Sequence, residues 1–380
     1  MSSSLLPLTR TARPGRTRLG LTAAALALPL ALAGCGGDDT GEGGGGDGEA
    51  KEPADLGAAY DRLLDAQTAT FPLSLDDGDG NLKRLATEDE TDPLNDETAD
   101  TVIGGKVVVT IDPAGDATLR EATQVDPAAS PADQLTAVNY SVSVEADGGP
   151  VAQLRLVDGA LFAAVDFDRI DGIAEGAGEE PLGPQLDGFA AQSPELAAAV
   201  EDLRAGQFLT LDLAPLLSTF EGLAGPTPTG APVDGAQLAE DLLAAVQPHS
   251  TVTGGEEGTF DVTVKAKPAL QAASQVFAEL PIPGVTDAID PTQFEALDDG
   301  DLRGTVSLQG ESLSQVTLDL DSVNDVNAPD EEDVELAGSD LVLGIDDEAD
   351  EVTAPGEVSD VDLNALVMSF FGAFAGTMPS

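Results

Sequence analysis

Residues 140–145 read Tyr140-Ser141-Val142-Ser143-Val144-Glu145, with large apolar side chains at the even positions and small or acidic ones at the odd positions. Successive side chains of an extended strand point to opposite faces of a sheet. Strict alternation over six residues therefore predicts a β-strand with one apolar face and one polar face.

The same alternation returns in other parts of the chain. The residues on the apolar faces are Val107, Val109 and Ile111; Leu154 and Leu156; Phe260, Val262 and Val264; Val306 and Leu308; Val316, Leu318 and Leu320; and the run 341–345. Strands that are apolar on one face only are typical of antiparallel sheets with one covered side. The sequence therefore predicts a large antiparallel sheet.

Apolar residues at helical spacing separate these strands. The predicted helices cover residues 55–68, 195–203, 212–220, 237–246, 268–280 and 362–374. The order of helix, strands, helices, strands and helix indicates an α+β fold, with helices packed on one face of the sheet, and not alternating βαβ units. We expect a single domain over residues 54–380. Segment 222–235, rich in Gly and Pro, is the best boundary if there are two domains.

An acidic stretch, residues 76–100, is expected to form an exposed loop. Asp77, Asp79, Asn81 and Glu88 match the ligand spacing of an EF-hand-like calcium loop, but Leu82 stands where the sharp turn needs glycine. Because acidic residues are so frequent in this chain, chance explains the match well. We favour a solvated acidic loop and predict no metal or other cofactor.

Two stretches share one plan of a glycine, an aromatic strand, an Asp and a helical turn. They are residues 157–166 (VDGALFAAVD) and 204–212 (RAGQFLTLD). This layout resembles actinobacterial lipoproteins of the LppX/LprG type and the wider LolA-like superfamily. The resemblance implies a curved antiparallel half-barrel, closed by helices around an apolar cavity that binds or carries lipids. It assigns no binding residue to a position of this chain.

The N-terminus has the pattern of a secretory signal over residues 1–34. Four arginines precede an apolar run at 19–32, and no acidic residue occurs there. Leu32-Ala33-Gly34-Cys35 resembles the lipobox of bacterial lipoproteins, which implies cleavage after Gly34 and a diacylglycerol thioether on Cys35. Cys35 is also the only cysteine of the chain, so no disulfide can form within it. An uncleaved N-terminal anchor helix is the alternative.

Residues 35–53, rich in Gly and Asp, are expected to form a flexible tether between the membrane and the folded body. Without residues 1–34 the chain has 12 basic and 70 acidic residues, and a net charge of −58. Such a charge repels nucleic acids and anionic headgroups. We expect attachment to the extracytoplasmic face of the cell membrane through the lipid on Cys35. The abundance of Ala and Gly and the scarcity of Lys are typical of high-GC bacteria such as actinobacteria.

Catalytic signals are weak. His249 is the only histidine, and we expect it at an exposed helix end. Zinc sites and triads that contain histidine need more such residues, and pairs among 70 carboxylates are uninformative. The sequence therefore favours a non-enzymatic envelope lipoprotein that binds a lipid or other hydrophobic ligand between sheet and helices. The alternative is a structural or interaction lipoprotein with a filled core, and an envelope hydrolase is a weaker third hypothesis.

Overall fold

The computed structural model describes residues 53–88, 93–122, 136–191, 193–213, 235–254, 258–278, 299–327 and 336–361. Several predicted segments lie outside these residues: the signal 1–34, Cys35, the tether up to residue 52, nearly all of the helix at 212–220, most of segment 222–235, and the helix at 362–374.

The described strands form one sheet in the order β6-β5-β4-β3-β2-β1-β11-β10-β9-β8-β7. Their bounds are β1 Ala69–Asp77, β2 Lys106–Pro113, β3 Val138–Ala146, β4 Gly149–Val157, β5 Ala160–Val165, β6 Leu209–Asp212, β7 Ser250–Gly254, β8 Thr259–Lys265, β9 Asp301–Gln309, β10 Ser312–Asp319 and β11 Ser339–Gly344. Every neighbouring pair is antiparallel. The predicted α+β fold with a large antiparallel sheet is confirmed.

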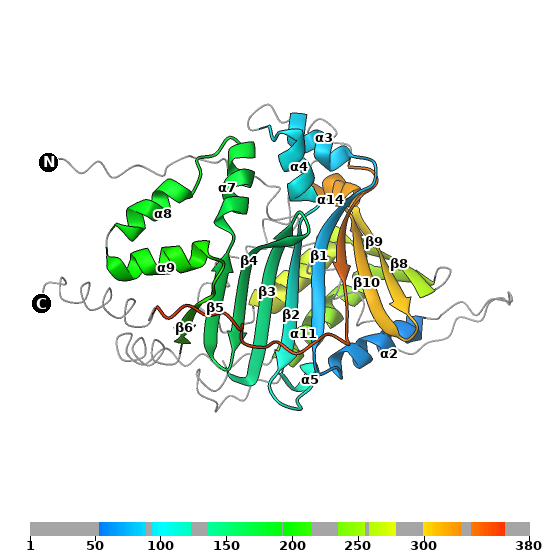
Figure 1. The fold of residues 1–380 in the computed structure, drawn as a ribbon. Helices are drawn as coiled ribbons and strands as arrows, with labels where there is room; N and C mark the ends of the chain where they lie inside the picture. The colour runs from blue at the N-terminus through cyan, green and yellow to red at the C-terminus, as the bar shows by residue number, and fades with distance from the viewer. Residues whose placement is uncertain are drawn as a thin grey trace, which may run out of the picture.

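Two runs of consecutive strands, β1–β6 and β7–β11, meet where β11 pairs with β1 (Figure 1). Leu73 lies opposite Leu343 at this junction. The hydrogen-bond ladder therefore continues from one run into the other.

Asp-Gly pairs make the two tight turns that join β3 to β4 and β4 to β5. Asp147 and Asp158 have φ angles of 50° and 51°, and Gly148 and Gly159, which follow them, have 73° and 78°. Positive φ at both central residues is the geometry of a type I′ turn, whose twist matches that of the flanking strands. The predicted turn and strand at 157–166 are thereby confirmed.

Along the chain, the described helices precede, separate and follow the strands. Their bounds are α2 Pro53–Leu64, α3 Asn81–Glu88, α4 Asp96–Ile103, α5 Leu119–Ala122, α7 Phe167–Gly176, α8 Gly183–Ala190, α9 Pro194–Arg204, α11 Gly235–Val246, α12 Ala266–Ala278 and α14 Leu320–Asn327, with a 3₁₀ turn η2 at Gln247–His249. Four of them, α2, α9, α11 and α12, match predicted helices with shifted ends. None of the helices in the described ranges is long and apolar enough to cross a membrane.

The acidic stretch 76–100 is not the exposed loop that we expected, because it contains the end of β1, all of α3 and the start of α4. Side-chain caps start both helices. The carboxylate of Asp77 accepts hydrogen bonds from the amides of Leu82 and Lys83, each at 2.9 Å. Asn95 accepts one from the amide of Thr98 at 2.9 Å. Such caps satisfy amides that have no partner within the helix.

The main hydrophobic core lies over the second run of strands. Leu56, Ala59 and Leu63 of α2, Val246 of α11 and Ala269 of α12 pack with buried side chains of β8, β9 and β10. In Figure 1, α11 and α12 lie behind the sheet. We call the face of the sheet that carries this core the inner face, and the opposite one the outer face.

Residues 346–361, the C-terminal strap, cross the outer face from the foot of β1 toward β6 (Figure 1). Asp346 exchanges two backbone hydrogen bonds with Thr70 of β1 at the start of the strap. Near its other end, the amide of Phe208 donates to the carbonyl of Glu357 at 3.2 Å, and the amide of Ser359 donates to the carbonyl of Phe208 at 2.8 Å. The strap therefore spans the first run of strands, from β1 to the residue that precedes β6.

Candidate functional site

Cross-strand register places one continuous row of side chains along the inner face. Residues opposite each other in neighbouring strands project from the same face. The row runs Leu209-Ala163-Leu154-Val142-Val109-Phe71 across β6 to β1, and then Leu73-Leu343-Val316-Val306-Phe260 from β1 across β11 to β8.

Over β8, β9 and β10 this row is fully packed. Phe260 and Val306 have no exposed surface, and Val316 keeps 4% of its surface exposed. Helices α2, α11 and α12 contribute the apolar side chains that cover these strands. This half of the inner face is an ordinary filled core.

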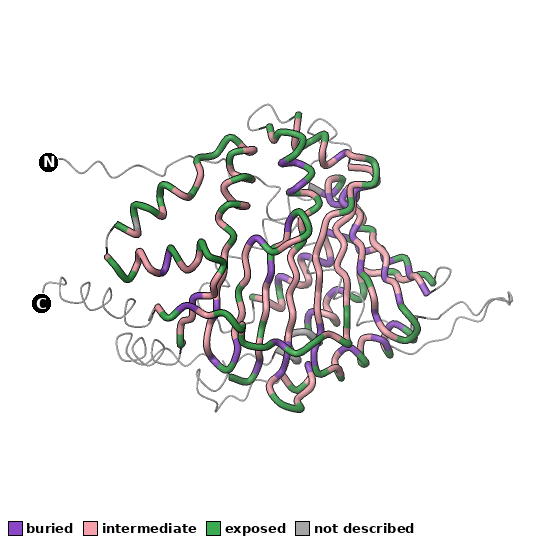
Figure 2. The backbone as a smooth tube through the Cα atoms, in the orientation of Figure 1, coloured by how far each residue is buried: buried purple, intermediate pink, exposed green. Residues whose placement is uncertain are grey.

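Over β2 to β5 the same face is open. Tyr140 is 40% exposed, and Val144 and Leu154 are each 42% exposed. The other inner-face side chains here are only partly buried: Val107, Val109, Ile111, Val142, Ala152, Leu156, Leu161, Ala163 and Val165. Figure 2 shows these strands mostly in the colours of intermediate and exposed residues. We call this set of twelve side chains the open apolar face; Ile111, at its boundary, also packs against the main core.

The open apolar face is uncharged at all twelve positions, although 23% of the residues of the chain are charged. The phenol of Tyr140 is its one polar group. Tyr140 lies opposite Ile111 on one side and Leu156 on the other. A surface of this composition offers burial to an apolar molecule and no ion pair to a charged one.

Beneath the strap, the outer face has a small core of its own. Val157, Phe162 and Val352 are buried together, and Phe208 and Val358 pack against them. The guanidinium carbon of Arg155 lies 5.2 Å from the centroid of the Phe208 ring. Its Nη1 also donates to the carbonyl of Thr353 at 3.1 Å. These contacts fasten the strap to β4, so this part of the outer face is occupied by the chain itself.

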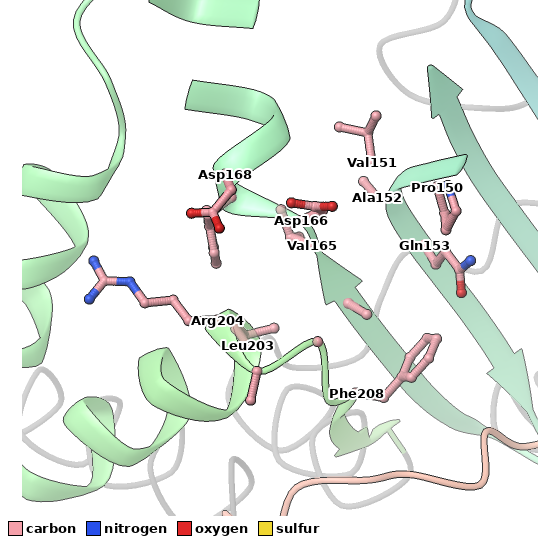
Figure 3. A pocket seen from close by; sticks show the side chains of 14 residues that line it. Pro150, Val151, Ala152, Gln153, Val165, Asp166, Asp168, Leu203, Arg204 and Phe208 are labelled. Atoms are coloured by element: carbon pink, nitrogen blue, oxygen red, sulfur yellow. The ribbon is translucent and has the colours of Figure 1, made fainter. Parts of the chain in front are cut away.

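A half-open cavity of about 390 Å³ lies where the end of α9 approaches β4 and β5. Gln153, Asp166, Asp168, Leu203 and Phe208 contribute to its lining, and Figure 3 shows how they surround it.

Two charged side chains of this cavity, Asp166 and Arg204, have structural partners. Asp166 caps α7 by accepting from the amide of Arg169 at 3.1 Å. Arg204 extends away from the cavity in Figure 3, and its Nη2 donates to Asp187 at 2.9 Å. Both groups are therefore engaged within the protein, and we place the candidate site on the open apolar face.

Two residues of the calcium-like spacing in residues 77–88, Asp77 and Asn81, take part in hydrogen bonds of the local fold. Burial by itself raises the pKa of Asp77, but hydrogen bonds from the amides of Lys83 and Leu82 and from the hydroxyl of Ser339 lower it overall. Asn81 donates to the carbonyl of Ala337 at 2.7 Å. The part of the chain that the structure describes contains no group of three or more His, Cys, Asp or Glu side chains that could hold a metal ion.

His249 is half-buried at the end of the turn η2. Cys35, the predicted lipidation site, lies outside the described residues, so its modification stays a prediction. Sequence reasoning identified most strands of the open apolar face, but it did not separate open from covered strands. The exposure of Tyr140, Val144 and Leu154 depends on where distant helices pack, and no local pattern reports that.

No family model matches this sequence, and no curated protein matches it. Among solved structures, the crystal structure of the Mycobacterium tuberculosis lipoprotein LppX matches 79% of this chain and 97% of that chain. The two sequences are 10% identical, and the TM-score is 0.26. So loose a superposition says nothing about the function of this chain. The fold follows from the register of its own strands.

Proposed function

We propose that this protein is a non-enzymatic lipoprotein, held by lipid on Cys35 at the extracytoplasmic face of the cell membrane, that binds a lipid or other hydrophobic molecule. The binding site in this proposal is the open apolar face. One observation carries it: a single inner-face row is fully buried at Phe260 and Val306 but 42% exposed at Leu154.

Apolar burial would provide the affinity. A hydrocarbon chain gains about 0.8 kcal/mol for each methylene that it removes from water. In neighbouring strands, Leu154 lies opposite Val142, and Val144 lies opposite Ala152, so these side chains together offer a continuous strip. A chain lying across β3 and β4 would cover apolar surface that water otherwise contacts.

The charge of the protein supports a lipid anchor as the means of attachment. With a net charge of −54 for the whole sequence, the folded body is repelled by anionic headgroups. One acyl chain gives only marginal membrane binding, whereas two give stable anchoring. A diacylated Cys35 would therefore keep the body near the membrane while the tether lets it move.

Mass spectrometry of organic extracts tests this function. Residues 36–380, the mature chain without its lipidated cysteine, are purified from a bacterial host, and we expect co-purifying lipid. Leu154→Asp and Val144→Asp should reduce the lipid recovered several-fold. Gln153→Asp is the matched control, because Gln153 is the neighbour of Leu154 on the outer face.

Repeated preparations without any lipid would overturn the proposal, and so would equal recovery from Leu154→Asp and Gln153→Asp. The first outcome favours a structural or interaction lipoprotein. Because Val144 and Leu154 are already part-exposed, a carboxylate at either position should leave folding intact, and circular dichroism checks that.

A further inference from the structure

Basic residues are scarce in the strands that form the open apolar face. Within β2 to β5 they are Lys106 and Arg155. Lys106 forms an ion pair with Glu145, with Nζ 3.0 Å from Oε2. Arg155 belongs to the outer face, where it stacks on Phe208 and donates to the strap. An anionic headgroup lying on these four strands would therefore meet no free cation in them.

Asp158 places an exposed carboxylate at one end of the same face. It lies in the turn between β4 and β5, outside the twelve apolar positions. Its amide donates to the side-chain oxygen of Asn139 at 3.1 Å. Asn139 immediately precedes Tyr140, and Tyr140 lies opposite Leu156, two residues before Asp158. The turn that carries Asp158 is therefore fixed beside the Tyr140 end of the face.

We propose that the ligand of the open apolar face is a cationic amphiphile. Its hydrocarbon chain would lie over Val142, Val144 and Leu154, and its positive head would lie at the end of the face marked by Tyr140 and Asp158. This inference rests on the proposed function and names the chemical class of the ligand.

The charge of the whole protein favours a positive head over the alternatives. With a net charge of −54, the protein attracts cations and repels a carboxylate or phosphate head. An uncharged head gains nothing from this field. Complementary charge of this kind mainly determines which ligands are selected, while burial of the hydrocarbon chain provides most of the affinity.

Tyr140 gives the head a second reason to lie at this end. Its side chain is the one aromatic ring of the face, and the residue is 40% exposed. The face of an aromatic ring attracts a cation placed over it. Tyr140 and Val144 are four residues apart in β3, about 14 Å along the strand. A hydrocarbon chain directed away from Tyr140 therefore has an apolar strip of that length to cover.

Isothermal titration calorimetry with two dodecyl amphiphiles tests the charge of the ligand. Dodecyltrimethylammonium has a positive head, and dodecyldimethylamine oxide has a head of similar size without net charge at neutral pH. Residues 36–380 should bind the cation several-fold more tightly, with both amphiphiles below their critical micelle concentrations. High salt should remove most of this difference, because it screens charges that are farther apart than a Debye length.

Asp158→Asn should remove most of the preference for the cation. Asp147→Asn is the matched control, because Asp147 holds the same left-handed turn position between β3 and β4, at the other end of β4. Both substitutions change the net charge by the same amount, and asparagine suits both turns. Equal losses from the two variants would show attraction to the net charge alone and would overturn the placement of the head at Asp158.

A second pair of variants places the chain on the inner face. Leu154→Asn should weaken the binding of both amphiphiles several-fold, and Gln153→Asn, on the outer face, should weaken neither. Equal effects from these two variants would overturn the placement of the chain, and circular dichroism checks that each variant is folded.

The outcomes separate this inference from the proposed function. If the amine oxide binds as tightly as the cation, or if anionic dodecanoate binds more tightly than either, the cationic class is wrong and the proposed function stands. If none of the three amphiphiles binds, the proposed function fails, and this inference fails with it.

Discussion

The buried carboxylate of Asp112 in β2 accepts a hydrogen bond from the amide of Val352 in the strap, at 3.0 Å and across 240 positions of the chain. Two further donors reach the same carboxylate, the hydroxyl of Thr68 and the side-chain amide of Asn139, each at 3.2 Å. Asp112 keeps 7% of its surface exposed. A buried charge of this kind is tolerated because protein donors replace the lost water. Asp112 therefore fixes the strap to the sheet.

Asp112→Ala should lower the free energy of unfolding by about 1–3 kcal/mol, because three donors lose their acceptor in a part of the protein that water reaches poorly. Urea denaturation measures the change. Asp116→Ala is the control, since Asp116 is an exposed carboxylate four residues away. Equal effects from the two substitutions would contradict the role assigned to Asp112.

The stacking of Arg155 on Phe208 should contribute about 1 kcal/mol to stability. A double-mutant cycle with Arg155→Met and Phe208→Leu isolates this coupling, because each change keeps most of the apolar volume. We expect the double variant to lose less stability than the sum of the two single variants. Additive losses would show that the 5.2 Å contact has no energetic weight.

The negative charge of Asp340 should lower the free energy of unfolding at neutral pH. Burial, and then the charges of Asp319 and Asp76, raise its pKa above the usual 3.8. These two carboxylates lie directly opposite Asp340 on the neighbouring strands. A group whose pKa is higher in the folded state stabilises the fold below its unfolded pKa, and this stability is lost as the pH rises through the folded value.

Asp340→Asn removes that charge and should raise the free energy of unfolding at pH 7 by about 0.2–1 kcal/mol, the range for cross-strand charge pairs. The gain should shrink as the pH falls toward 3.8 and below, where the wild-type carboxyl is itself protonated. Urea denaturation at pH 7 and at pH 3 measures both values. A gain independent of pH would point to a cause other than charge.

Cys35→Ala should move the protein from the membrane fraction to the medium or periplasm, because it removes the predicted acylation site. Cell fractionation followed by immunoblotting measures the distribution. Cys35→Ser is the companion variant and should behave in the same way, since a hydroxyl does not replace the thiol in the thioether. Retention of both variants in the membrane would reject the lipid anchor.

Much of the sheet could be predicted from alternation alone. The stretches at 107–111, 140–145 and 260–264 fall within β2, β3 and β8, and the turn at Asp158 is present. The stretch at 316–320 falls within β10 except for Leu320, which begins α14. The prediction for the acidic stretch was wrong because α3 and α4 carry few large apolar residues among many polar ones. Their starts depend on caps by Asp77 and Asn95, and the Asn95 cap was readable from residue type.

The sequence by itself determined which side chains share a face, since alternation follows from the geometry of an extended backbone. It also determined the uncharged character of that face. Only the tertiary structure decided which part of the face is covered. The covering residues of α2 and α12 are separated by about two hundred positions in sequence, and they pack over β8 to β10 through long-range contacts. Local patterns carry no information about such contacts. The open apolar face is consequently a property of the assembled sheet and not of any single strand.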